Sequence, residues 1–234
     1  MPADTDHDAP SRRRLIIDEA ICLFLEKGYA ATSMSQLAAA CGIQKASLYH
    51  HFPSKEALFV ACATDGFEEA IRELEAIRAD ASLDDDERFR RTLDTIYRIN
   101  IDSACGRMAP LIAEVSRTIP GVARAFHDGF IMRQHGMMKA VIDDGIARGS
   151  FVEHERLGFE QMVFGPVVTM MLEREMFTTF DQFDSLRPID RIRREHATLL
   201  LRLLHGGAGE RRATVGRSRA GAVAASATKR ARPR

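Results

Sequence analysis

Helical periodicity is the feature that most constrains the fold of this 234-residue chain. Apolar residues recur at intervals of three and four, as in amphipathic helices. Alternating β-branched runs are few, and Asn-Gly hairpin signals are absent from the sequence. We therefore expect an all-α fold. Besides two short helices within 32–51, the predicted helices span about 11–27, 55–78, 84–102, 108–117, 122–148, 157–177 and 189–205.

Charge is divided unevenly along the chain, although 33 Lys and Arg residues balance 33 Asp and Glu residues. Residues 11–62 carry six basic and four acidic side chains, whereas residues 63–205 carry 19 basic and 25 acidic ones. Residues 1–10 hold three Asp, and residues 206–234 hold eight basic residues, one acidic residue and few large apolar ones. We therefore expect a flexible leader (1–10), a small domain (11–62), a larger domain (63–205) and a disordered basic tail (206–234). The neutral total does not exclude a nucleic-acid partner.

Cysteine spacing and hydropathy indicate a reduced, cytoplasmic protein. The cysteines at 22, 41, 62 and 105 lack the CxxC or His spacing of a metal site. We expect no metal and no cofactor, and we expect Cys22 and Cys41 in the core because they fall on apolar helix stripes. The longest apolar stretch, 164–172, is far shorter than the roughly 20 residues that span a bilayer. Neither membrane insertion nor export is expected, since the acidic start lacks a signal region.

Residues 28–59 hold two short amphipathic segments separated by a glycine turn. Thr32 and Ser33 offer capping hydroxyls to the first segment, and Gly42 suits a turn that needs positive φ. In the second segment, about 44–51, the spacing of Leu48 and Phe52 turns both side chains toward the interior. This pattern predicts a helix-turn-helix unit.

The outward positions of the second segment carry hydrogen-bond donors that suit DNA. Gln44 can pair with adenine, and Lys45 can reach guanine or a phosphate. A helix that starts after Ser54 offers free backbone N–H groups to a phosphate. A helix of this kind fits the major groove. Helix-turn-helix units also occur in all-α proteins that never bind DNA, so the spacing alone leaves both possibilities open.

The run GYAATSMSQLAAACGIQKASLYHHFPSKEALF, residues 28–59, closely resembles the signature of the tetracycline-repressor (TetR) family of bacterial transcription regulators. The matching positions are Gly28 and Tyr29, Thr32 and Ser33, Leu48 and Tyr49, His51 and Phe52, and Ser54 to Leu58. The resemblance covers about residues 11–62. It implies a three-helix DNA-binding domain followed by a larger helical bundle for ligand binding and dimerisation. It further implies a homodimeric repressor that binds a palindromic operator in double-stranded DNA and is released by a small-molecule effector.

The resemblance also implies DNA contacts residue by residue. It places Tyr49 and Lys55 at phosphates, and Gln44 and Lys45 at base edges. Thr32 is expected to cap a helix and to contact a phosphate, whereas His51 is equally suited to a hydrogen bond within the fold. The full set of expected contacts is Thr32, Ser33, Gln44, Lys45, Ala46, Ser47, Tyr49, His50, His51 and Lys55, with Ala46 in place of the glycine common in the family.

For the larger domain, the resemblance implies dimerisation through the helices at 157–177 and 189–205. The apolar residues there suit either an intersubunit four-helix packing or an intramolecular core. The middle helices offer an apolar lining for an effector, and we expect an apolar or aromatic ligand, although such residues more often belong to an ordinary core. The expected pocket residues are Met108, Phe126, His127, Phe130 and Met137.

Catalytic sequence motifs are absent: the chain has no GxGxxG, GxxxxGK[ST], GxSxG or HExxH. We therefore expect no enzymatic activity and no catalytic residues. The main alternative to a ligand-released repressor is a regulator of another kind, either an activator or a regulator controlled by a protein partner. The sequence does not separate these alternatives.

Overall fold

All regular structure in the described part of the chain is helical, which confirms the expected all-α class. A computed structural model describes residues 11–206 apart from 105, 178 and 181, so the expected leader and nearly all of the expected tail lie outside the described residues. Segments η1 and η3 are 3-10 helices, and η2 and η4 are π-helices. The elements are α1 (Arg12–Ala31), α2 (Met34–Ala40), α3 (Lys45–His51), α4 (Lys55–Thr64), η1 (Asp65–Phe67), α5 (Glu68–Ala79), α6 (Asp85–Tyr97), η2 (Arg98–Asp102), η3 (Gly106–Met108), α7 (Ala109–Val115), α8 (Pro120–Phe126), η4 (His127–Ile131), α9 (Met132–Ala147), α10 (Arg156–Met176), α11 (Phe183–Leu186) and α12 (Ile189–Leu204).

Turn and capping residues set the helix ends close to their predicted positions. Gly28 interrupts α1 with a φ of 78°, a conformation that glycine adopts without strain. Ser54 caps α4, because its Oγ accepts a hydrogen bond from the backbone N–H of Ala57 at 3.0 Å. Three predicted helices are interrupted by η1, η2 and η4, and the sequence pattern did not predict α11.

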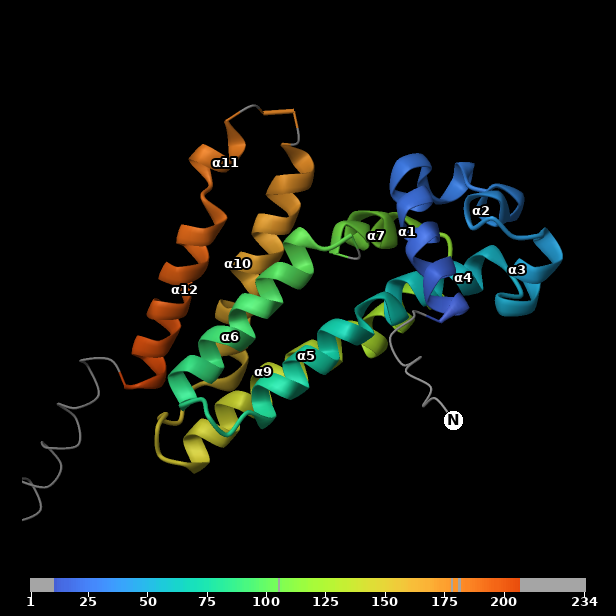
Figure 1. Ribbon diagram of the computed structural model, residues 1–234. Coiled ribbons are helices and arrows are strands. Elements are labelled where there is room, and N and C mark those ends of the chain that lie inside the picture. The colour runs from blue at the N-terminus through green and yellow to red at the C-terminus, as the bar shows by residue number, and fades with distance from the viewer. Residues whose placement is uncertain (1–10, 105, 178, 181, 207–234) are drawn as a thin grey trace, which may run out of the picture.

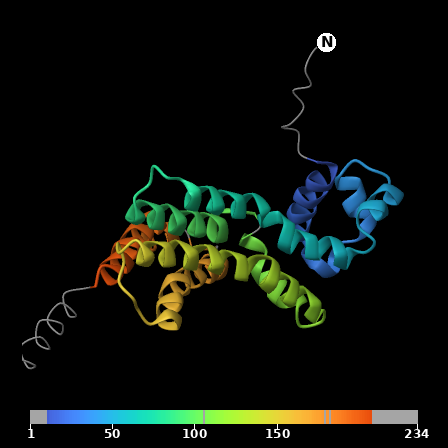
Figure 2. The ribbon, with the colours of Figure 1, turned by 90° about the horizontal axis from the view of Figure 1, so that it is seen from below.

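The helices form two groups, which we call the head (α1–α4) and the body (α5–α12). Helices α4 and α5 follow one another almost in line and lead from the head into the body (Figures 1 and 2). In the body, α6 packs against α5, α9 and α12, while α10 and α12 lie side by side at the end far from α3 (Figure 1). Helices α7 and α8 reach back to the head, where they contact α1 and α4. The head is therefore held by α4 and by these two helices.

The core of the head is aromatic and fixes the orientation of α3. The Phe24 and Phe59 rings meet edge to face with centroids 5.1 Å apart, and Tyr29 packs on Phe59 at 4.9 Å. Leu48 is the buried residue of α3, and Phe52, directly after the helix, is buried as well. Because these two anchors hold one face of α3, the rest of that helix is left to solvent.

The apolar residues of α10 and α12 divide between the core and the surface. Val163, Val167 and Met170 of α10 point into the core of the same chain. The apolar residues that remain exposed on the two helices are Leu157, Met162, Val168, Leu172, Met176, Leu199 and Leu203. The same helices therefore contribute one apolar face to the core and leave a second face exposed.

The free cysteines differ in exposure. Cys62 is buried and Cys41 is partly buried, whereas Cys22 is exposed. The expectation that Cys22 belongs to the core is therefore wrong. Cys22 follows the buried Ile21 and is turned about 100° around α1 from it, which brings its thiol to the surface.

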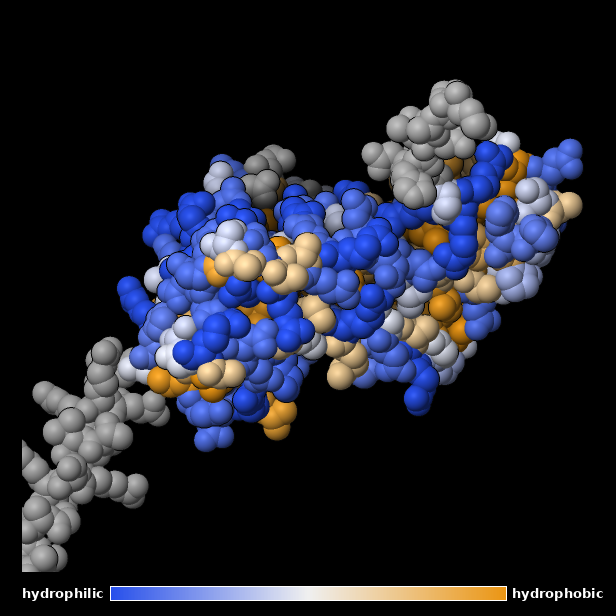
Figure 3. All heavy atoms as spheres, turned by 60° about the horizontal axis from the view of Figure 1, so that its bottom comes forward, coloured by the Kyte–Doolittle hydropathy of each residue, from blue (hydrophilic) through white to orange (hydrophobic). Residues whose placement is uncertain are grey.

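No membrane-spanning helix is found within the described residues. None of the helices found there combines the length and the apolar character of a membrane span. The face of the molecule seen in Figure 3 is mainly hydrophilic, and its apolar residues form small separate patches.

Candidate nucleic-acid interface and ligand pocket

Helix α3 presents a row of polar side chains to solvent. Gln44 precedes the helix as its N-cap and makes no capping hydrogen bond with its side chain, so the amide remains available. The Lys45 ammonium lies 5.9 Å from the centroid of the Tyr49 ring, and Tyr49 is 43% exposed. The exposed residues in this segment are Gln44, Lys45, Ala46, Ser47, Tyr49 and His50. This row has the donors and the shape that the major groove accepts.

The turn before α3 is set by α2 and by one glycine. Ser33 forms a capping box with Gln36: the Ser33 hydroxyl accepts from the Gln36 backbone N–H, and the Gln36 side chain accepts from the Ser33 backbone N–H at 2.8 Å. Gly42 then adopts a φ of 62°. The backbone N–H of Ile43 donates to the Ala38 carbonyl at 3.0 Å, which closes the turn. Ser33 thus has a structural role as a cap while remaining exposed.

The Thr32 side chain is structural. It is only 2% exposed, and its hydroxyl donates to the Gly28 carbonyl at 2.7 Å. A buried hydroxyl that already has an acceptor does not face a phosphate in this conformation. We therefore correct the expectation of a phosphate contact for Thr32 and assign its side chain to the link between α1 and α2.

Lys55 also has a structural role that its position in the sequence did not reveal. Its ammonium donates to the backbone carbonyls of Tyr29 and Thr32, both at 2.8 Å, and lies 4.3 Å from the centroid of the Tyr29 ring. Two of its three N–H groups are thereby used, and one is left for a phosphate. Lys55 ties the start of α4 to the end of α1, and its contact with a phosphate stays a prediction.

His51 is partly buried next to His50, and the two ring centroids lie 5.8 Å apart. Among the described residues, neither imidazole shows a hydrogen bond to another side chain. The internal hydrogen bond that His51 is suited to make is therefore not found in the described part of the chain. Its contact with DNA stays a prediction.

Arg13 and Arg14 of α1 differ from Lys45 in having ion-pair partners. Arg13 pairs with Asp65, and Arg14 pairs with Asp18 at 2.9 Å. Lys45, by contrast, has no ion pair within the described residues. It is therefore a basic side chain of α3 that is free to meet a phosphate or a guanine.

The five residues expected around an effector divide between the core and the surface. Met108 and Phe130 are buried in the core, and Met137 is partly buried. Phe67 of η1 stacks on Phe130 with centroids 3.7 Å apart and also contacts Phe126. This aromatic packing fills the space where we expected a cavity, and His127 is exposed beside Asp128.

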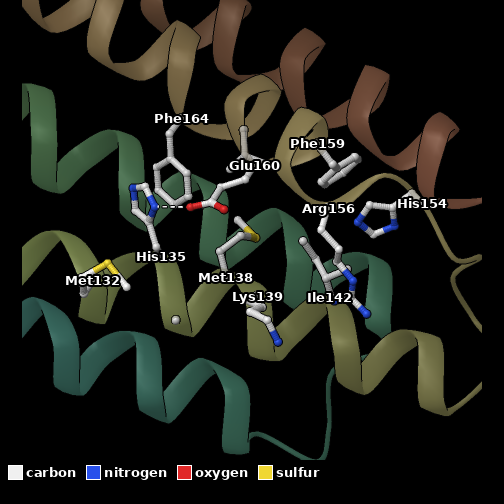
Figure 4. A pocket seen from close by; sticks show the side chains of 12 residues that line it. Met132, His135, Met138, Lys139, Ile142, His154, Arg156, Phe159, Glu160 and Phe164 are labelled. Carbon is white, nitrogen blue, oxygen red and sulfur yellow. Dashed lines mark hydrogen bonds and ion pairs between the residues drawn. The ribbon is translucent and has the colours of Figure 1, made fainter.

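A pocket of about 190 Å³ lies instead between α9 and α10 (Figure 4). Its floor is apolar, while two cations and two histidines lie along its rim. Two methionines of α9, Met132 and Met138, line this pocket, whereas Met137 does not. The lining residues are Met132, His135, Gly136, Met138, Lys139, Ile142, His154, Arg156, Phe159, Glu160, Val163 and Phe164.

Comparison with known sequences agrees with the geometry of the head. The sequence model of the bacterial regulatory proteins of the tetR family matches residues 16–62. The HTH-type transcriptional repressor KstR2 of Rhodococcus jostii is 28% identical over 150 residues, which are 64% of this chain and 72% of that protein. The negative regulator IcaR of the biofilm operon icaADBC in Staphylococcus aureus is 49% identical over 53 residues, which are 21% of this chain and 28% of that protein.

Comparison with solved structures extends the likeness to the body. The regulator FadR of Bacillus subtilis, solved in complex with stearoyl-CoA, superposes with a TM-score of 0.63 at 17% identity over 83% of this chain and 98% of its own. The TetR-family regulator PfmR of Thermus thermophilus superposes with a TM-score of 0.56 at 26% identity, over 80% of this chain and 97% of its own. The family match, the helix-turn-helix geometry and the shared fold together show that the chain belongs to the TetR family of DNA-binding transcription regulators, which are not enzymes.

Proposed function

We propose that this regulator is a repressor that binds a palindromic operator as a homodimer and leaves it when a small molecule binds the body. The observation that carries the proposal is the exposed row on α3, where Gln44, Lys45 and Tyr49 stand on a helix anchored from below by Leu48. Relatives that share the head sequence are named as a repressor and a negative regulator, which favours repression over activation.

The head and the body would have different functions. Residues 11–62 would bind DNA, and residues 63–205 would dimerise and bind the effector. Contacts of α4 with α8 and of α1 with α7 support a coupling between the two. A ligand that shifts α8 or α9 would move α4, and with it the angle at which α3 meets the groove.

Dimerisation is supported by the exposed apolar face of α10 and α12. Leu157 is 81% exposed, Met176 is 71% exposed and Leu199 is 57% exposed, and these side chains lie on two helices that run side by side. Exposed apolar side chains gathered on two adjacent helices mark an interaction site. A second copy of the same helix pair would complete a four-helix packing and cover it.

Replacing Leu199 with Glu tests the dimer. A carboxylate at the centre of a buried apolar interface costs several kcal/mol unless it is paired, so L199E should be monomeric at concentrations where the wild type is dimeric. Light scattering after size-exclusion chromatography measures the mass. The control is Leu15→Glu, which places the same charge at an exposed leucine of α1 and should leave the dimer intact. If L199E is still dimeric, α12 does not belong to the dimer interface.

Repression itself is tested with DNA from upstream of the chain's own gene. The wild type should retard this duplex in a mobility-shift assay, and deletion of the gene should raise transcription from the adjacent promoter. A fall in transcription would favour the activator alternative. Release that requires another protein, with no small molecule effective, would favour a regulator controlled by a protein partner.

A further inference from the structure

The pocket between α9 and α10 has an apolar, elongated floor. Met138 and Ile142 of α9 face Phe159 and Val163 of α10 across it, and all four side chains are otherwise buried. The lining extends along α9 from Met132 to Ile142, a distance of about 15 Å at the helical rise of 1.5 Å per residue. An apolar chain of a ligand could lie along this floor and fill the pocket.

Two cations, Lys139 and Arg156, lie at the end of the pocket near His154 (Figure 4). Lys139 Nζ lies 2.5 Å from one oxygen of Asp143, and the Arg156 guanidinium contacts the other oxygen. A further acidic partner of Arg156 is Glu153, which is 3.6 Å away and largely exposed. The Asp143 carboxylate is shared between Lys139 and Arg156, and the ion pair of Arg156 with the exposed Glu153 is weak in water. This end of the pocket can therefore accept an added anion.

The opposite end carries a pair of another kind. The His135 ring stacks on Phe164 with centroids 3.7 Å apart, and its Nδ1 lies 2.5 Å from a carboxylate oxygen of Glu160. Figure 4 shows the Glu160 carboxylate turned toward His135, on the side away from Arg156. The acidic residue of the lining is thereby held apart from Lys139 and Arg156, so the two cations of the lining lie together at one end of the pocket.

We propose that this pocket is a ligand site for an amphipathic anion, an apolar chain of medium length that carries one carboxylate or phosphate at its end. The chain lies on the Met138, Ile142 and Val163 floor, and the anionic group lies between Lys139 and Arg156. The regulatory consequence of this binding rests on the proposed function, since a ligand that spreads α9 from α10 would act on the dimeric repressor described above. The binding itself does not depend on that function.

A series of decyl compounds tests the chemistry. Decanoate, decanoyl-CoA, decanol and decylammonium share one apolar chain and differ in the head group. Isothermal titration of each into the full chain should give roughly tenfold tighter binding for an anion than for decanol, the effect of one charge-assisted hydrogen bond. If decanoyl-CoA binds and decanoate does not, the anionic group that the pocket accepts is a phosphate of the coenzyme A moiety. Equal binding of decanol and both anions, or a preference for decylammonium, would overturn the proposal.

Two variants locate the site. The Lys139→Met and Arg156→Met double variant should lose the preference for the anion while keeping the affinity for decanol. Gly136→Leu should abolish binding of all four compounds, since a side chain at Gly136 enters open space within the pocket. Leucine is also the better helix former, so this variant should fold. Arg124→Met, at an exposed arginine outside the pocket, is the matched control. Wild-type affinity in Gly136→Leu would place the ligand elsewhere and overturn the proposal.

DNA binding measured in parallel separates the two proposals. Gly136→Leu should bind duplex DNA as the wild type does and should no longer respond to decanoate or decanoyl-CoA. Anion-selective binding that Gly136→Leu abolishes supports the site even if the chain binds no operator, in which case the proposed function fails alone. Normal DNA binding with no affinity for any decyl compound overturns the site and leaves the proposed function standing.

Discussion

Individual side chains of α3 divide between holding the helix and meeting DNA. Leu48 is fully buried and fixes the helix in the head, whereas the side chains of Gln44 and Tyr49 are exposed and show no hydrogen bond within the described residues. A side chain that reads a base edge changes sequence preference, and a side chain that holds a phosphate changes affinity for every sequence. The two kinds of residue are therefore distinguishable by substitution.

Gln44→Ala should alter the order of preference among operator variants. Loss of one bidentate base contact costs about 1–3 kcal/mol at the position that it reads and little elsewhere. Tyr49→Phe should instead weaken binding to all sequences alike, because it removes a hydroxyl expected at a phosphate. Fluorescence anisotropy with a panel of single-base operator variants measures both effects. A uniform loss across the panel for Gln44→Ala would contradict its assignment to a base.

Two lysines of the head should behave differently when their charge is removed. Lys55→Met takes away two hydrogen bonds to the Tyr29 and Thr32 carbonyls, so we expect about 1–3 kcal/mol less stability and weaker DNA binding. Lys45→Met removes an exposed ammonium and should weaken DNA binding with no measurable change in the free energy of unfolding. Urea denaturation followed by circular dichroism gives both values. Equal stability of the two variants would deny Lys55 its structural role.

Three helices of the body are joined by one buried polar chain. The Tyr97 hydroxyl of α6 lies 2.9 Å from His196 Nδ1 of α12, and His196 Nε2 lies 2.8 Å from the Met162 carbonyl of α10. A carbonyl only accepts, so Nε2 donates to Met162, and Nδ1 accepts from the Tyr97 hydroxyl. Burial raises the pKa of Tyr97 to about 12 and lowers the pKa of His196. The neutral imidazole therefore links the two helices of the proposed dimer face to the core.

Acidification should loosen this link. The pKa of His196 is lower in the folded chain than its ordinary value of about 6.5, so the unfolded chain takes up the proton first. The stabilisation by His196 is complete above pH 6.5 and is lost as the pH falls below it. Thermal unfolding at pH 7.5 and 5.5 should show a smaller stability difference between wild type and His196→Gln at the lower pH.

The matched control for this experiment is His127→Gln, at an exposed histidine that pairs with its neighbour Asp128. This variant should follow the wild type at both pH values, because it leaves His196 in place. A difference between wild type and His196→Gln that grows on acidification would show that the imidazole is not held neutral.

Across the whole molecule, turn residues, capping residues and apolar spacing predict the local structure well. The sequence predicts contacts between distant segments less well. Gly28, Gly42 and Ser54 predict breaks or ends of helices, and the structure has them there. The apolar spacing in α1 and α3 predicts which side chains form the core of the head. The prediction that Cys22 is buried is wrong because the apolar residues of α1 are spaced too irregularly to fix the rotation of the helix about its axis.

Contacts between segments far apart in the chain explain the remaining differences. Lys55 finds its carbonyl partners 23 and 26 residues away, and the expected effector cavity is filled because Phe67 reaches Phe130. The pocket between α9 and α10 likewise depends on how two helices diverge after a turn. No spacing within either helix encodes that angle.

The head and the body together predict a two-fold symmetric DNA site. If α3 lies in the major groove and the chains pair through α10 and α12, two recognition helices face one side of the duplex, with half-sites about 34–36 Å apart or a multiple of this distance. Selection of binding sequences from a random duplex library by the full chain tests this. The account predicts enriched palindromes, bound by one or more dimers, and a changed base preference at one position of each half-site for Gln44→Ala. Failure to enrich any duplex, even at low salt where phosphate contacts are strongest, would contradict it.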